Sequence, residues 1–148
     1  MNRRQKLVQQ EFLNNEAGII RRLDQVYSQA LKDVDANIKT LEQLVANAQR
    51  ADLYLFPEMC STGFCMQPQG IAEEVDGSTV QLMKRLAVEY DAAMVVPVMT
   101  HENGKYYNRM YFITPDGVQG LYDKNNLFEY SGEDKVFISM CKSCECRK

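Results

Sequence analysis

The sequence predicts an α/β fold, in which helices alternate with the strands of a largely parallel sheet. Residues 33–49 place apolar side chains at spacings of three and four, as one face of a helix does. Residues 52–56 form a short apolar run that Pro57 ends, as expected of a buried strand. Strands that alternate with helices form β-α-β units, and such units build parallel sheets.

Two helices carry this prediction. The apolar stripe of the first consists of Val34, Ile38, Leu41, Val45 and Ala48. Either Asp33 or Asp35 can cap the start of this helix, because a short acidic side chain accepts hydrogen bonds from the first free N–H groups. A second helix is expected to begin at Ser78 or Thr79.

The strands are expected between and after these helices. Residues 93–99 form the next strand, although Pro97 is unfavourable at a central position of a sheet. Residues 106–114 and 118–122 are expected to form two strands joined by a turn at Pro115-Asp116-Gly117. In parallel sheets functional groups gather at the carboxyl ends of the strands, which directs attention to the residues after each strand.

The two ends of the chain are less regular. Residues 1–32 mix apolar with polar and charged positions, and we expect helix rather than strand there. In particular, residues 21–28 (RRLDQVYS) make a poor central strand. From residue 138 onward the sequence ISMCKSCECRK shows no period.

Composition narrows the classes of function. The chain has 148 residues, of which 45% are hydrophobic and 25% charged, and its formal net charge is −3, so it lacks the basic character of a nucleic-acid-binding protein. No apolar run approaches the roughly 20 residues that span a bilayer. The N-terminal MNRRQKLVQQ lacks the apolar core of a secretory signal. We therefore expect a cytoplasmic protein with no nucleic-acid and no membrane partner.

The cysteines favour reduced thiols. They number five, at positions Cys60, Cys65, Cys141, Cys144 and Cys146. An odd count without an export signal argues against a disulfide framework, and Cys60 is best interpreted as a buried structural thiol. The last three form a C-x-x-C-x-C cluster that could hold a metal ion, but a fourth ligand would have to come from His101 or Cys65. We favour incidental cysteines in the tail, and expect neither a metal nor a cofactor.

Two motifs can carry chemistry. In Leu55-Phe-Pro-Glu-Met59 a strand delivers Glu58 to its carboxyl end, where apolar neighbours would desolvate the carboxylate and suit it for general-base catalysis. In Tyr122-Asp-Lys124 a strand end presents Lys124, which could stabilise an oxyanion. A solvated loop glutamate and an ordinary surface lysine are the alternatives for these two side chains.

Several motifs in order give the sequence a family resemblance. LFPEM and STGF are followed by GKYYNRMYFITPDG and then by YDKNNLF and GEDKVF. This series resembles the nitrilase superfamily of carbon–nitrogen hydrolases, and within it the omega-amidase-like branch. The resemblance implies a partial α-β-β-α sandwich over residues 33–137, between divergent segments at 1–32 and 138–148. It also implies a Glu–Lys–Cys triad, with the glutamate matching Glu58, the lysine matching Lys124 and a further structural glutamate matching Glu133.

The resemblance implies a mechanism and leaves one part unassigned. A thiolate generated by Glu58 would attack a small amide, and Lys124 would stabilise the oxyanion. The family places its cysteine farther along the chain than the 24 residues that follow Lys124 here. The lysine motif also differs, with Asn126 where a histidine is common. We therefore expect a truncated chain with weak or no activity; the alternative is a non-catalytic pseudoenzyme, an assembly partner or a non-functional fragment. The resemblance also implies a small amide substrate and a homodimer as partners.

Overall fold

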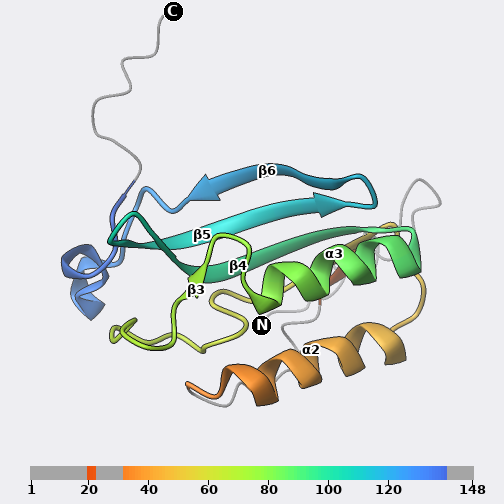
Figure 1. The fold of residues 1–148 in the computed structure, drawn as a ribbon, viewed down its shortest axis with the longest axis horizontal. Helices are drawn as coiled ribbons and strands as arrows, with labels where there is room; N and C mark the ends of the chain where they lie inside the picture. The colour runs from red at the N-terminus through yellow and green to blue at the C-terminus, as the bar shows by residue number, and fades with distance from the viewer. Residues whose placement is uncertain (1–19, 23–31, 140–148) are drawn as a thin grey trace, which may run out of the picture.

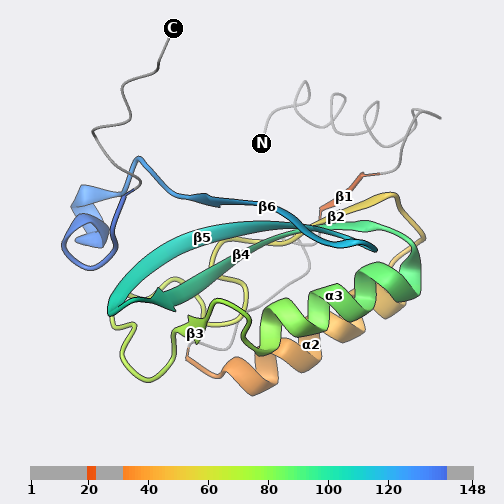
Figure 2. The same cartoon turned by 45° about the horizontal axis from the view of Figure 1, so that its top comes forward.

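The computed structural model describes residues 20–22 and 32–139, and the structural statements below concern these ranges. Within them a single sheet is covered on one face by two helices, α2 and α3 (Figures 1 and 2). This two-layer α/β arrangement confirms the predicted fold class. The cysteines of the C-x-x-C-x-C cluster, interpreted above as incidental, lie outside the described residues.

Both predicted helices are present. α2 (Val34–Asn47) begins as expected, since the carboxylate of Asp33 accepts a hydrogen bond of 3.0 Å from the N–H of Ala36. α3 (Ser78–Tyr90) begins at the predicted residue. Their apolar stripes face the sheet and each other, because burying these side chains is what stabilises an amphipathic helix in water.

The sheet is mixed rather than largely parallel. Its strands are β1 (Ile20–Arg22), β2 (Leu53–Leu55), β3 (Glu73–Glu74), β4 (Ala93–Glu102), β5 (Lys105–Thr114) and β6 (Gly117–Asp123). They are ordered β1-β2-β4-β5-β6, with β3 also paired to β4. The pairs β1–β2, β2–β4 and β3–β4 are parallel, whereas the longer β4–β5 and β5–β6 pairs are antiparallel. The antiparallel part arises because β4, β5 and β6 are joined by tight turns, which allow no crossover.

One expectation about the strands is wrong, and the strand expected over residues 93–99 is confirmed despite its proline. The backbone of Ile20–Arg22 forms a strand parallel to β2, where helix was expected; its short ladder is set by pairing and not by apolar alternation. Pro97 lies well inside β4, but β2 pairs with β4 only as far as Val95. The carbonyl of Pro97 accepts a hydrogen bond of 3.1 Å from the N–H of Cys60. The nitrogen of Pro97 faces the same side of β4 as this carbonyl. That side lies beyond the end of β2, so the missing N–H of proline costs no hydrogen bond between strands.

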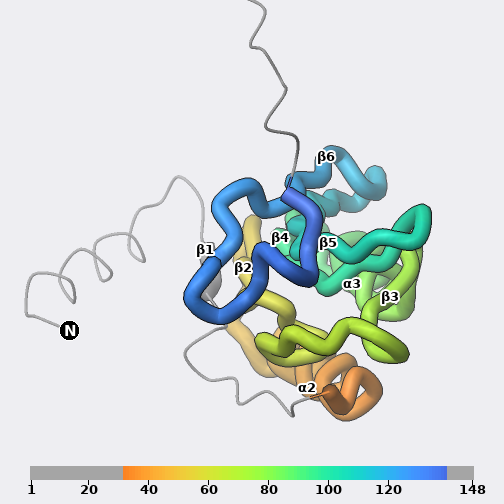
Figure 3. Tube along the Cα trace, turned by 90° about the vertical axis from the view of Figure 1, so that its left-hand side faces the viewer, coloured from red at the N-terminus to blue at the C-terminus, as the bar shows by residue number. Residues whose placement is uncertain are grey.

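Two apolar clusters hold these layers together. The larger lies between the helices and the sheet and includes Leu41, Tyr54, Met83, Leu86, Met94 and Ile113. The smaller consists of Met59, Cys65, Met99 and Phe137. It joins the segment after β2 to the segment after β6, which lie at the same end of the sheet (Figures 1 and 3). The predicted functional residues belong to these two segments.

Candidate active site

Glu58 lies in a tight turn just beyond β2. Its neighbours Phe56 and Met59 are buried, in the larger and the smaller cluster respectively. Met59 has a positive φ of 48°, an uncommon conformation for a residue with a side chain, and its carbonyl accepts from the N–H of Gly63 at 2.8 Å. The glutamate is thereby turned out of the apolar layer while its neighbours point into it.

Buried polar contacts fix this turn to the rest of the fold. The side chain of Asn37 on α2 donates to the carbonyl of Ser61 at 2.9 Å. The hydroxyl of Ser61 donates to Glu73 at 2.7 Å, and Glu73 also accepts from the N–H and the hydroxyl of Thr79 at the start of α3. Since both helices hold the segment after Glu58, the position of its carboxylate is set by the scaffold and not by a free loop.

Lys124 follows directly on β6. The strand ends at Asp123, whose two carboxylate oxygens accept from the guanidinium of Arg109 at 2.6 and 2.9 Å. The N–H of Lys124 then donates to the carbonyl of Asn108 on β5 at 2.9 Å, which continues the β5–β6 ladder by one residue. Because side chains alternate along a strand, Asp123 and Lys124 point to opposite faces of the sheet.

Glu133 is fully buried at the start of a short 3-10 helix, η2 (Glu133–Lys135). It follows Gly132, whose φ of 79° suits glycine, and the preceding 3-10 helix η1 (Glu129–Ser131). One of its carboxylate oxygens accepts from the N–H of Phe128 at 2.7 Å. Four residues later Phe137 enters the smaller apolar cluster, which anchors the segment beneath the carboxylate.

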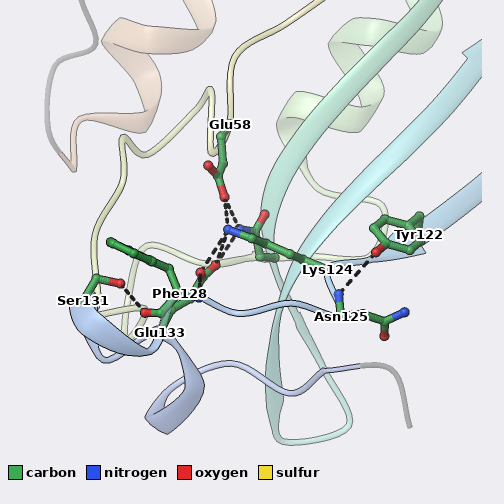
Figure 4. Close-up of polar contacts among 8 residues, drawn as sticks. Glu58, Tyr122, Lys124, Asn125, Phe128, Ser131 and Glu133 are labelled. Carbon is green, nitrogen blue, oxygen red and sulfur yellow. Dashed lines mark hydrogen bonds and ion pairs between the residues drawn. The ribbon is translucent and has the colours of Figure 1, made fainter. Parts of the chain in front are cut away.

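These segments bring three charged side chains together (Figure 4). The ammonium of Lys124 donates to Oε1 of Glu58 at 2.7 Å, and to Oε2 and Oε1 of Glu133 at 2.9 and 3.2 Å. The side-chain amide of Asn108 donates to Oε1 of Glu58 at 2.7 Å and to Oε1 of Glu133 at 2.8 Å. We call the three charged residues the Glu58–Lys124–Glu133 cluster, and the side chain of Asn108 its bridging amide.

The charges of the cluster reinforce one another. Partial burial acts to lower the pKa of Lys124, but the hydrogen bonds and charges of Glu58 and Glu133 outweigh it, and the pKa is raised. Burial likewise acts to raise the pKa of Glu133, but the hydrogen bonds from Asn108, Phe128 and Lys124 lower it below its ordinary value. The structure therefore favours a charged ammonium and a charged buried carboxylate at neutral pH.

One expectation about the site is wrong and another is confirmed. Desolvation of Glu58 was predicted, but 46% of its side chain is exposed, because it turns away from its apolar neighbours towards Lys124. Cys60 is buried as predicted, and burial raises the pKa of its thiol far above the ordinary range, with Glu73 adding to the effect. Cys65 is also buried. Neither described cysteine therefore presents an accessible thiolate, while Cys141, Cys144 and Cys146 lie outside the described residues.

Asn108 is the residue of the site that sequence reasoning missed. It lies on β5 within the GKYYNRMYFITPDG stretch, and 4% of it is exposed. An amide in the middle of a strand rich in apolar and aromatic residues was the available signal, since a buried amide needs partners. Its partners come from segments 50 and 25 residues away, which the sequence alone could not bring together.

Comparison with known proteins identifies the family. A family model described as carbon-nitrogen hydrolase matches residues 21–145. The chain belongs to the carbon-nitrogen hydrolase family. It is 28% identical over 107 residues to omega-amidase YafV of Yersinia enterocolitica, and 30% identical over 98 residues to an (R)-stereoselective amidase of a Pseudomonas species. The first of these relatives supports the expected omega-amidase-like branch.

The fold agrees with this assignment. The structure of XC1258 from Xanthomonas campestris, a CN-hydrolase superfamily protein with an arsenic adduct in its active site, aligns with a TM-score of 0.71 and 29% identity. That alignment covers 76% of this chain and 43% of XC1258. An N-terminal amidase bound to an Asn-Glu-Ala peptide aligns with a TM-score of 0.64 at 19% identity, which shows a shared fold.

The comparisons also show how much of such a protein is present. The alignments cover 72% of this chain and 41% of the omega-amidase, and 65% of this chain and 36% of the stereoselective amidase. The chain thus spans about two fifths of the length of these relatives. In the described part of the chain no helix is long and apolar enough to cross a membrane, and no group of three or more acidic, histidine or cysteine side chains is arranged to hold a metal ion.

Proposed function

We propose that the Glu58–Lys124–Glu133 cluster is the acid–base and oxyanion-binding part of a site that hydrolyses small amides. The observation that supports this most is the lysine ammonium held between two carboxylates, with Glu58 on its exposed side and Glu133 on its buried side. An ordinary surface lysine would not be fixed by a carboxylate from each of two distant segments. The family membership of the chain supplies the reaction class.

Each residue has a distinct role in this proposal. Glu58 is the general base that takes the proton of a cysteine thiol, so that the thiolate attacks the carbonyl carbon of the amide. Lys124 stabilises the negative oxygen of the tetrahedral intermediate. Glu58 then returns the proton to the leaving nitrogen, which departs as ammonia. It next accepts a proton from water as the water attacks the thioester, and returns that proton to the cysteine sulfur as the C–S bond breaks, which frees the carboxylic acid and regenerates the thiol. Glu133 touches no reacting atom and holds the ammonium of Lys124 in place.

Within the described residues no cysteine supplies the nucleophile. Cys60 and Cys65 are buried, while Cys141, Cys144 and Cys146 lie outside the described residues. We therefore propose that the 148-residue chain by itself is weakly active or inactive. We propose the monoamide of a dicarboxylic acid as the substrate, which the omega-amidase-like motifs of the sequence favour.

A non-catalytic role in assembly is the second candidate. It is favoured by large apolar side chains that are exposed on β5 and β6, namely Met110, Phe112, Val118, Leu121 and Tyr122. Such a surface would suit packing on a second protein, or on a second copy in a homodimer. A single monomeric species in sedimentation equilibrium at micromolar concentration would argue against the homodimer.

Ammonia release tests the amidase proposal. The purified chain is incubated with succinamate and glutaramate, beside the Glu58→Gln variant and an Asp134→Asn control that neutralises an exposed carboxylate next to the cluster. We expect little or no release from any of the three. A clear rate that Glu58→Gln abolishes would show that the nucleophile is within the chain. A clear rate that Glu58→Gln leaves unchanged would contradict the assigned site.

A further inference from the structure

The feature that goes beyond the assigned residues is the side chain of Asn108. Its single NH₂ group donates to Glu58 at 2.7 Å and to Glu133 at 2.8 Å, so one amide joins two carboxylates from different segments. The backbone carbonyl of Asn108 also accepts from the backbone N–H of Lys124 at 2.9 Å. One residue of β5 therefore touches all three charged members of the cluster.

The chemistry of the cluster fixes the orientation of this amide. Turned the other way, the carbonyl oxygen of Asn108 would face two carboxylate oxygens, and acceptors facing acceptors repel. With the NH₂ inward, each carboxylate accepts one N–H. Because the side chain is buried on a central strand of the sheet, water cannot readily substitute for it.

A neutral donor suits a cluster that contains a general base. Two carboxylates near one ammonium carry a formal charge of −1 and repel each other. A second cation at this position would relieve the repulsion, but it would also suppress the basicity that Glu58 needs. An amide relieves part of the repulsion through two hydrogen bonds and adds no charge.

We propose that Asn108 is a positioning residue that couples the carboxylate of Glu58 to that of Glu133 and sets both around the ammonium of Lys124. The inference deepens the proposed function, on which the catalytic meaning of this coupling rests. Asn108 contacts no substrate in this scheme and acts only through the two glutamates and the lysine.

The test measures the carboxylates themselves and needs no enzymatic activity. The side-chain carboxyl carbons of Glu58 and Glu133 are followed by ¹³C NMR from pH 2 to pH 8 in wild type, in Asn108→Leu, which keeps the volume and removes both donors, and in Asn126→Leu as control. Asn126 is an exposed asparagine two residues from Lys124. We expect Asn108→Leu to move the titration midpoint of Glu133 upward and to shift the Glu58 carboxyl resonance at pH 7, and Asn126→Leu to change neither.

The outcomes separate this inference from the function. An unchanged Glu133 midpoint together with an unchanged Glu58 resonance in a folded Asn108→Leu protein would overturn it. If that variant does not fold, the side-chain amide protons of wild-type Asn108 are measured instead. They should shift as Glu133 titrates and again in Glu58→Gln, and amide protons that respond to neither change would overturn the coupling. An amide that couples the carboxylates in a protein whose clear hydrolysis rate is unchanged by Glu58→Gln would refute the proposed function and leave the coupling intact.

Discussion

Replacing Glu133 with glutamine removes the charge of the most deeply buried member of the cluster and keeps its size. Three donors reach this carboxylate, from Asn108 at 2.8 Å, Lys124 at 2.9 Å and the Phe128 N–H at 2.7 Å. A hydrogen bond to a charged partner stabilises a protein by about 1 kcal/mol more than a neutral one. In the variant, the NH₂ group of the new glutamine faces one of these donors, and such an unsatisfied contact costs about 1–3 kcal/mol of stability. Lys124 still pairs with Glu58 in the variant, and 29% of its side chain is exposed to water, so the loss of its ion pair with Glu133 costs less stability. We expect the free energy of unfolding to fall by about 2–4 kcal/mol.

Urea unfolding followed by circular dichroism at pH 7 measures this loss, with Asp134→Asn as the control expected to stay within about 0.5 kcal/mol of wild type. The pKa of Glu133 is lowered from its ordinary value of 4.5, so its stabilisation is complete above that value and is lost as the pH falls through the lower, folded-state pKa. The difference between wild type and Glu133→Gln should therefore be constant from neutral pH down to pH 5 and shrink below 4.5. A loss under about 1 kcal/mol at pH 7, or a difference that grows in acid, would refute this reasoning.

Three further predictions concern other parts of the chain. Gly77→Ala should destabilise the protein by about 1–3 kcal/mol in urea unfolding, because a Cβ there would lie 2.7 Å from the Cβ of Glu73. As the control, Gly120→Ala should change the stability by no more than about 0.5 kcal/mol, because a Cβ there would have nothing within 4 Å. Cys60 should resist alkylation by iodoacetamide at pH 8 in the folded protein and react after unfolding, since burial raises the pKa of its thiol. Peptide mass mapping measures the labelling, and rapid alkylation of Cys60 in the folded protein would contradict this prediction. Lys124→Met should lower the free energy of unfolding by about 2 kcal/mol at pH 7, because the two carboxylates paired with Lys124 are left to repel each other. The loss should be smaller at pH 4, where protonation relieves this repulsion. An equal loss at both pH values would contradict this prediction.

Much of the fold followed from periodicity. The helix starts at Asp33 and Ser78 and the hairpin at Pro115-Asp116-Gly117 are local features, and the structure confirms them. The antiparallel β4–β5 pair also had a local signal that was not used, since Asn103-Gly104, both with positive φ, form the kind of turn that closes a hairpin. The strand at Ile20–Arg22 had no such signal, because its pairing partner sets its conformation.

The site was predictable only in part. Glu58 and Lys124 follow strands, and Glu133 was found by family resemblance, so their identities came from the sequence. The exposure of Glu58 did not, because a local sequence shows which neighbours are apolar but not where each side chain points. The bridging role of Asn108 depends on contacts that span 50 and 25 residues, and such contacts exist only once the sheet has formed.

The central proposal is that the Glu58–Lys124–Glu133 cluster serves a cysteine nucleophile in the hydrolysis of small amides. The most direct test is to read the coding DNA through and past the Phe137 codon in all three frames. The account predicts that one frame continues with an apolar strand that ends in a cysteine motif of the family. A locus with no such motif in any frame would contradict it, and would direct the search for a role towards binding or assembly.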